Sequence, residues 1–200
     1  MTRWYREKKK EHFYKEAKRV GYRARSSFKL LQIQKKFNVI KRNDTIVDLG
    51  AAPGGWSQVA KEIVGENGTV IGIDLLQIVS LSDVTFLQSD MTKETSLREL
   101  EKILDGKRVN VVISDMSPDI SGNYSVDHAR SIYLCEQALK TAETILNLNG
   151  NFVCKVFSGP DLEDFINKVN KKFRLVKRFF PPASRKSSSE IYIIAKFFRK

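Results

Sequence analysis

The chain has 200 residues, of which 42% are hydrophobic and 29% are charged, and its formal net charge is +12. This length suffices for one well-packed domain with a small appendage. No apolar run approaches the length of a membrane span, and the N-terminus lacks the apolar core of a secretory signal. The only two cysteines, Cys135 and Cys154, disfavour a disulfide framework or a four-ligand zinc site, so we expect a cytoplasmic protein that does not enter membranes.

Charge is segregated along the chain. Residues 1–42 hold 15 basic and 3 acidic residues, and residues 168–200 hold 11 basic residues and one acidic residue. Residues 43–167 between them hold 9 basic and 19 acidic residues. Two basic ends around an acidic middle favour a polyanion-binding surface built from both termini. The alternative is a solvated, lysine-rich face in a protein of lysine-biased composition.

In chain order, residues 1–22 are predicted to form a basic N-terminal arm, and residues 23–200 the main domain. A helix is predicted over residues 26–37, with Ser26 or Ser27 as its N-cap. Short apolar runs then alternate with longer helical stretches. The predicted strands are 45–50, 69–75, 84–90, 109–115, 150–157, 173–180 and 190–198. The predicted helices between them lie near 55–64, 94–105, 127–147 and 160–172.

This alternation predicts an α/β fold with a mostly parallel sheet that is covered on both faces. No helix separates the last two strands, which are joined by PPASRKSSS, so we expect them to pair antiparallel. Ligands of such sheets bind at the carboxyl ends of the strands.

Four early strands end at or near an acid, namely Asp48, Asp74, Asp90 and Asp115. The first strand continues into DLGAAPGGWSQ (48–58), a tight glycine turn that has neither the dinucleotide spacing nor a P-loop lysine. Asp74 is placed to accept hydrogen bonds from a ribose, and Asp90 from an adenine amine. A positively charged nucleoside without phosphates suits this pocket, which indicates S-adenosylmethionine (SAM). The alternative is that each acid merely caps the following helix.

Taken together, five motifs resemble the FtsJ/RrmJ family of RNA ribose 2′-O-methyltransferases over about residues 20–198. They are YRARSSFKL (22–30), DLGAAPGGWSQ, ISDMSPDISG (113–122), CKVF (154–157) and SSSEIY (187–192). The resemblance implies a Rossmann-like fold of seven strands with the last one inserted antiparallel. It also implies a catalytic tetrad of Lys29, Asp115, Lys155 and Glu190. By the same resemblance, SAM is expected to be held by Gly54, Trp56, Asp74, Asp90 and Asp115.

The chemistry of ribose methylation explains why such residues are needed. A 2′-hydroxyl is a poor nucleophile that needs a proton acceptor and in-line orientation. Lys155 lies in an apolar strand, where burial and a second lysine would lower its pKa and let it accept the proton. Lys29 would be the second cation, Asp115 would hold Lys155 and favour the sulfonium, and Glu190 would pair with one or both lysines.

Structural roles remain open for each of these residues. Lys155 could protect a strand edge, Lys29 could extend from its helix to solvent, and Asp115 could cap a turn. Trp56 could belong only to the core, and Glu190 could be a surface residue.

The expected activity is SAM-dependent 2′-O-methylation of RNA by a monomer. By resemblance, the favoured target is a uridine of 23S ribosomal RNA, free or in the large ribosomal subunit, with a ribose of the tRNA anticodon loop as the alternative. A non-catalytic RNA-binding protein on the same fold would have lost one of the site residues. A small-molecule methyltransferase would not need the basic ends. The reaction requires no metal.

Overall fold

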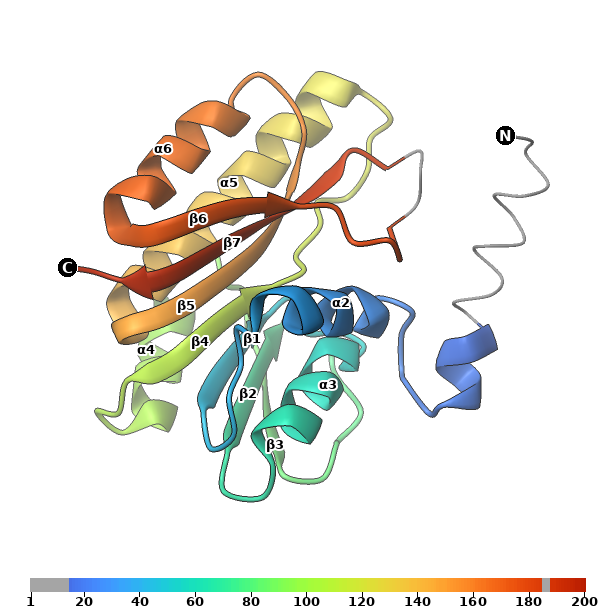
Figure 1. Cartoon of the computed structure of the whole chain (residues 1–200), viewed down its shortest axis with the longest axis vertical. Helices are drawn as coiled ribbons and strands as arrows, with labels where there is room; N and C mark the ends of the chain where they lie inside the picture. The colour runs from blue at the N-terminus through green and yellow to red at the C-terminus, as the bar shows by residue number, and fades with distance from the viewer. Residues whose placement is uncertain (1–14, 185–187) are drawn as a thin grey trace.

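The computed structural model describes residues 15–184 and 188–200, which form a seven-stranded sheet with helices on both faces (Figure 1). The strand order is β3-β2-β1-β4-β5-β7-β6. The strands are β1 (Thr45–Leu49), β2 (Thr69–Asp74), β3 (Val84–Gln88), β4 (Val109–Ser114), β5 (Leu146–Phe157), β6 (Phe173–Phe179) and β7 (Glu190–Phe198). The helices are α2 (Ser27–Phe37), α3 (Gly55–Val64), α4 (Glu94–Leu104), α5 (Tyr124–Ile145) and α6 (Leu162–Lys172).

Strand directions confirm the predicted fold. Strands β1 to β5 pair in parallel, whereas β7 lies between β5 and β6 and is antiparallel to both. The strand order reverses between β1 and β4. The carboxyl ends of β1, β2, β3 and β4 therefore open at one edge beside this switch point, where ligands of doubly wound sheets bind.

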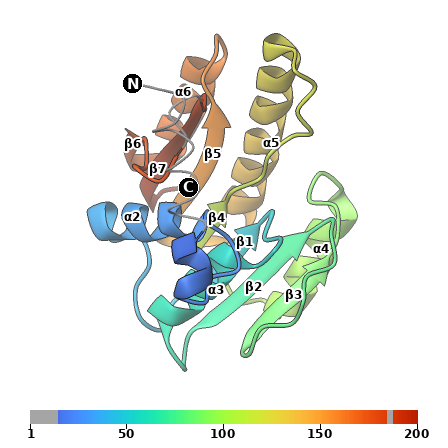
Figure 2. The same ribbon diagram turned by 90° about the vertical axis from the view of Figure 1, so that its right-hand side faces the viewer.

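The helices divide into two layers. Figure 2 shows α2 and α3 on one side of the sheet and α4 and α5 on the other. The first layer packs Leu30, Ile33 and Val59 against the sheet, and the second layer packs Leu100 and Leu139. Helix α6 contacts α5 and contributes Phe165 to the core of the second layer. Because both faces are covered, the inner strands are buried along nearly their whole length, as their continuous apolar sequences predict.

Most element boundaries lie within two residues of the sequence expectation, and the largest differences are at the starts of α5 and β5. Helix α5 begins at Tyr124 and ends at Ile145, and β5 follows directly at Leu146. Ser26 is the N-cap of α2, as expected, but its side chain makes no capping bond. Ser27 instead donates its hydroxyl to the Gly55 carbonyl, so this serine ties α2 to α3.

Residues 1–14 of the predicted basic arm lie outside the described residues, and the boundary of the arm stays a prediction. Residues 15–19 are helical, and Ala17 is buried. The Tyr22 hydroxyl donates to Glu62 at 2.8 Å. This part of the arm therefore packs against the domain on the α3 side.

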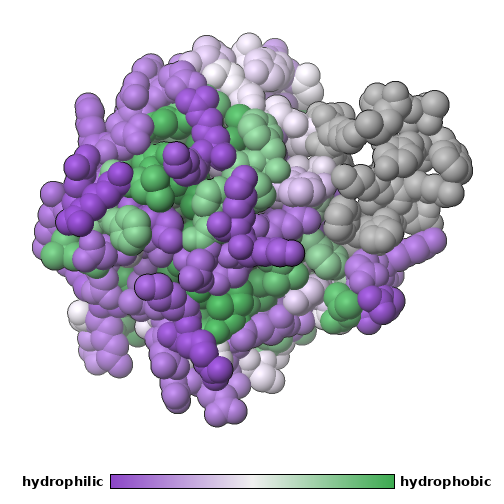
Figure 3. Space-filling view, viewed as in Figure 1, coloured by the Kyte–Doolittle hydropathy of each residue, from purple (hydrophilic) through white to green (hydrophobic). Residues whose placement is uncertain are grey.

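None of the helices in the described part of the chain is long and apolar enough to cross a membrane. On the face drawn in Figure 3, hydrophilic residues cover most of the surface, with hydrophobic residues between them.

Candidate active site

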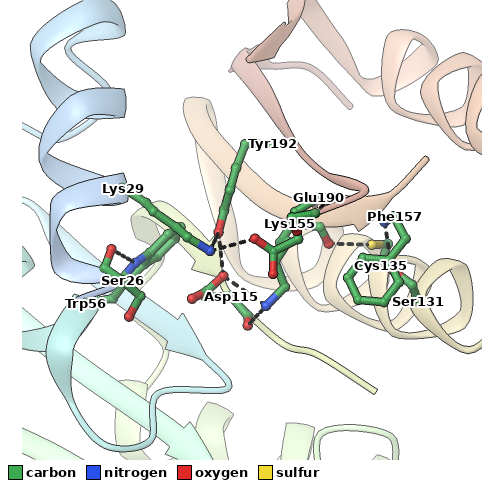
Figure 4. Close-up of polar contacts among 11 residues, drawn as sticks. Ser26, Lys29, Trp56, Asp115, Ser131, Cys135, Lys155, Phe157, Glu190 and Tyr192 are labelled. Carbon is green, nitrogen blue, oxygen red and sulfur yellow. Dashed lines mark hydrogen bonds and ion pairs between the residues drawn. The ribbon is translucent and has the colours of Figure 1, made fainter. Parts of the chain in front are cut away.

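Two lysine–carboxylate pairs lie side by side where α2 meets β4, β5 and β7 (Figure 4). Lys29 Nζ is 2.8 Å from Glu190 Oε2. Lys155 Nζ is 3.0 Å from Asp115 Oδ1 and donates to the Asp115 carbonyl at 2.6 Å. The structure thus brings together all four residues of the expected tetrad. Within the described residues, Glu190 forms an ion pair with Lys29 and none with Lys155, and the carboxylate that pairs with Lys155 is that of Asp115. Their catalytic role stays a prediction.

Tyr192 joins the two pairs into one network, which sequence analysis did not foresee. Its hydroxyl accepts a hydrogen bond from Lys29 Nζ at 3.1 Å and donates to Asp115 Oδ1 at 2.7 Å. Burial, followed by the charges of Asp115 and Glu190, raises the pKa of Tyr192 well above its ordinary value. The phenol therefore keeps its proton and acts as a neutral bridge between the ammonium of Lys29 and the carboxylate of Asp115.

Strand register places these side chains on one face. Lys155 of β5 lies opposite Tyr192 of β7, and residues opposite one another project to the same side of a sheet. Glu190 is two residues before Tyr192 and shares that face. The two-residue period of EIYIIAKFF was thus a signal that could have identified Tyr192.

Both lysines are almost completely buried, with exposed fractions of 5% for Lys29 and 6% for Lys155. Neither extends to solvent, as a lysine that only snorkels would. Each amine instead contacts oxygen atoms of neighbouring residues inside the domain.

The first of two adjoining cavities, here named the lysine cavity, has a volume of about 570 Å³. Its basic lining residues are Arg25, Lys29 and Lys155. The remaining lining residues are Asp115, Ser117, Ile120, Gly122, Tyr124, Asp127, His128, Phe157, Ser188, Ser189 and Glu190. Three cationic and three carboxylate side chains thus line this cavity together with several hydroxyl groups. Its cations and hydroxyls can hydrogen-bond a ribose phosphate.

The second cavity, here named the acidic cavity, has a volume of about 470 Å³ and lies at the ends of β1, β2, β3 and β4. Four carboxylates line it, those of Asp74, Asp90, Asp115 and Asp119. Within the described part of the chain, no lysine or arginine is among its lining residues. Apolar side chains such as Leu75 complete the wall. Carboxylates combined with apolar surface suit a cationic ligand with an aromatic or aliphatic body, and SAM meets that description.

Two of these carboxylates are positioned by backbone amides. Asp74 accepts hydrogen bonds from the backbone N–H groups of Ala52 and Leu76, both at 2.8 Å. It thereby holds the glycine turn beside the loop that follows β2. Asp90 accepts from both the backbone N–H and the hydroxyl of Thr92, which lowers the pKa of Asp90 and keeps it charged.

Gly54 and Trp56 do not line the acidic cavity. Trp56 is 2% exposed, donates its indole N–H to the Ser26 carbonyl at 2.8 Å, and packs against the Tyr192 ring. Gly54 has a φ of 102°, and a Cβ at this position would lie 2.9 Å from the Arg23 guanidinium. In the structure both residues support the walls of the site, and their contact with a cofactor stays a prediction.

Asp48 also lies outside the cavity lining, although the sequence places it in the same row of carboxylates. It is fully buried within β1, and Ser57 donates to Oδ2 at 2.6 Å. Among the described residues, no group hydrogen-bonds Asp48 Oδ1. Burial, reinforced by the charges of Asp115 and Asp74, raises the pKa of Asp48 to about 7.

Arg23 connects the N-terminal segment to both loops of the acidic cavity. Its guanidinium donates to the carbonyls of Val79, Ser80 and Pro53, at 2.5, 2.6 and 3.4 Å. This residue therefore clamps the loop after β2 to the glycine turn, and no sequence motif had indicated the contact.

The serines before β7 shape the rim of the lysine cavity. Ser189 accepts a backbone hydrogen bond from Ser158 at 2.8 Å, and the Ser188 hydroxyl accepts from the Glu190 N–H at 3.3 Å. These bonds fix the point at which Glu190 enters the site.

Within the described ranges, no group of three or more His, Cys, Asp or Glu side chains is arranged to hold a metal ion.

This sheet order, with a glycine turn after β1 and acidic residues at the ends of β2 and β3, defines the class of Rossmann-like methyltransferases. A sequence model of the FtsJ-like methyltransferase family matches residues 22–198. The chain therefore belongs to the FtsJ-like methyltransferase family.

Similar curated proteins carry one name, "Ribosomal RNA large subunit methyltransferase E". The protein from Methanocaldococcus jannaschii is 49% identical, over 97% of this chain and 81% of its own length. The protein from Acinetobacter baumannii is 47% identical, over 98% of this chain and 91% of its own length. A crystal structure described as a ribosomal RNA methyltransferase from Plasmodium falciparum superimposes with a TM-score of 0.80 at 29% identity, covering 88% of this chain and 98% of that one.

Proposed function

We propose that the protein transfers a methyl group from SAM to the ribose 2′-hydroxyl of a nucleotide in RNA. The observation that carries this proposal is the junction of the two cavities, which share Asp115 and Ser117. At this junction the acidic cavity, suited to a cationic methyl donor, opens into the lysine cavity, whose lysines and hydroxyls can bind a ribose phosphate. Methyl transfer needs such a junction because donor and acceptor must meet in line.

In this proposal the carboxylates of Asp74, Asp90 and Asp115 hold SAM in the acidic cavity. When bound, SAM supplies an electrophilic methyl group on a sulfonium. The carboxylates attract the positive charge, and the apolar side chains beside them exclude water from the ligand.

On the acceptor side, Lys155 is the proposed general base. The ribose oxygen would take the methyl group that bound SAM supplies, with a thioether as the leaving group, and the Lys155 amine would accept the hydroxyl proton. Asp115 orients that amine through the 3.0 Å contact and stabilises its charge once it is protonated.

Lys29 is the proposed orienting cation. Its contacts with Glu190 and Tyr192 fix its ammonium at the wall of the lysine cavity. From there it can donate to the ribose or to a neighbouring phosphate, which holds the hydroxyl in line with the donor.

The proposed target is a uridine of 23S ribosomal RNA, free or in the large ribosomal subunit. The names of the curated relatives support this choice over a ribose of the tRNA anticodon loop, whereas the predicted RNA-binding basic ends suit either RNA. A monomeric state and a cytoplasmic location belong to the same proposal.

The test is to incubate the protein and methyl-labelled SAM with large ribosomal subunits, free 23S RNA and total tRNA in separate reactions. We expect label in the 23S RNA, free or within the subunit. Label in tRNA alone would show that tRNA, and not 23S RNA, is the substrate. Label in none of the three would contradict the proposed activity.

A further inference from the structure

One wall of the lysine cavity is aromatic and has no role in the reaction proposed above. Tyr124 and His128 both line this cavity, one turn apart at the start of α5. Their rings are nearly parallel, with an interplanar angle of 11° and a centroid separation of 6.4 Å. This geometry is that of an offset-stacked pair.

His128 contacts one face of the Tyr124 ring and is itself held in a fixed position. It is 2% exposed, and its Nδ1 lies 3.2 Å from the Phe157 carbonyl. Because a carbonyl oxygen only accepts, Nδ1 carries the hydrogen. The other nitrogen, Nε2, lies 3.2 Å from the Asp161 N–H. A Cβ at Gly159 would lie 2.3 Å from the ring, so glycine leaves the space that the imidazole occupies.

Tyr124 is held in place and yet exposed. Its hydroxyl donates to the Ser158 carbonyl at 2.6 Å, so the polar end of the side chain is already satisfied. The side chain is nevertheless 58% exposed. With one ring face against His128, the exposed area belongs to the other face and the ring edge, which border the cavity.

We propose that Tyr124, backed by His128, is a stacking site for an unpaired nucleobase of the RNA strand whose ribose enters the lysine cavity. A rigid aromatic face beside cationic side chains is the arrangement that binds single-stranded nucleic acid, because bases stack on the ring while phosphates meet the cations. Arg25, Lys29 and Lys155 supply those cations in the same cavity. The inference rests on the proposed function, since it assumes an RNA acceptor.

The first test replaces Tyr124 by tryptophan as a fluorescent reporter. Single-stranded oligouridine is expected to quench the Y124W variant saturably, whereas an abasic ribose-phosphate oligomer of equal length quenches it little. The matched control is Y133W, on the same helix, because Tyr133 is 49% exposed and is not among the cavity-lining residues. Equal quenching of both variants, or by both oligomers, would overturn the proposal.

The second test measures affinity for the same two oligomers by anisotropy. Tyr124→Leu is expected to raise the Kd for oligouridine roughly 5- to 150-fold, the range of one lost stacking contact. Tyr124→Phe keeps the ring and is expected to stay within about twofold of the wild type. SAM affinity and cooperative unfolding serve as folding controls: SAM affinity should not change in either variant, and the unfolding midpoint should fall only slightly, because the hydrogen bond to Ser158 is lost in both.

An unchanged oligouridine Kd in the Tyr124→Leu variant would contradict stacking, as would failure of the wild-type chain to bind oligouridine. Methyl transfer to ribosomal RNA is measured separately. If transfer occurs and stacking is absent, only this inference fails; if stacking occurs without transfer, the proposed reaction fails.

Discussion

Lys155 and Lys29 are both buried, but their amines hydrogen-bond to different groups. We therefore expect substitution of the two lysines to have different consequences. Lys155 is held by the carboxylate and the carbonyl of Asp115 at the junction of the two cavities. Lys29 is held on the other side of Tyr192 by Glu190. The proposed base and the proposed orienting cation are therefore coupled only through a neutral phenol.

Lys155→Met should lower kcat by at least about 100-fold, the scale of general-base catalysis, and leave the KM for SAM unchanged. Single-turnover kinetics with labelled SAM measures this loss. Lys140→Met, at an exposed position of α5, is the charge-matched control and should keep full activity. Turnover near the wild-type rate in Lys155→Met would refute its role.

Glu190→Gln should reduce kcat less than Lys155→Met does, because Glu190 only positions Lys29. In double-mutant cycles, Glu190→Gln and Lys29→Met should be strongly non-additive, since the two side chains are 2.8 Å apart. Glu190→Gln and Lys155→Met should be closer to additive. Equal and complete losses from both single changes would show that the role assigned to Glu190 is wrong.

At the scale of helices and strands, the sheet was the feature that the sequence predicted best. The side-chain contacts that link one element to another were predicted least well. Continuous apolar runs identify buried strands, and the missing helix before EIYIIAKFF predicts the antiparallel end of the sheet. The four tetrad positions follow from motifs. The two-residue period of EIYIIAKFF places Tyr192 on the same face as Glu190. It does not encode the contacts of Tyr192 with Asp115 and Lys29, which are 77 and 163 positions away.

Arg23 is the clearest example of such a link between elements. It joins the segment before α2 to two loops of the acidic cavity by hydrogen bonds to three carbonyls. Charged donors to carbonyls form strong hydrogen bonds, so the clamp restricts the loop after β2. The segment that carries it also leads from the predicted basic arm to the proposed SAM site.

Arg23→Ala should therefore weaken SAM binding about tenfold, as expected from the loss of one charged hydrogen bond, while kcat at saturating SAM changes little. Isothermal titration calorimetry with SAM measures this effect. Arg98→Ala, which breaks an exposed ion pair with Glu94 on α4, is the matched control. Unchanged SAM affinity in Arg23→Ala would mean that the clamp does not shape the cavity.

For the molecule as a whole, the buried Asp48 makes folding stability depend on pH. Its pKa rises from the ordinary 3.8 to about 7 in the folded chain. Between these values the folded state binds more protons than the unfolded state, so the free energy of unfolding falls as pH rises. The difference corresponds to at most about 4 kcal/mol, fully lost above pH 7.

Asp48→Asn should remove this dependence, because the amide carries no charge and keeps an oxygen for the Ser57 hydroxyl. Urea unfolding at pH values from 4.5 to 8 measures the effect: the variant's free energy of unfolding should fall less over that range than the wild-type value. Asp164→Asn, at an exposed position of α6, is the control. An identical pH slope in Asp48→Asn and the wild type would contradict the raised pKa.

The central claim is that the methyl group goes to a ribose oxygen. The most direct measurement is to methylate large-subunit RNA with isotopically labelled SAM, digest it to nucleosides and locate the label by mass spectrometry. The proposal predicts label on the ribose of one 2′-O-methylated nucleoside, in an amount that saturates at one methyl group per RNA, and labelling at least about 100-fold slower with Lys155→Met. Label on a base, or labelling at an equal rate by the Lys155→Met variant, would contradict it.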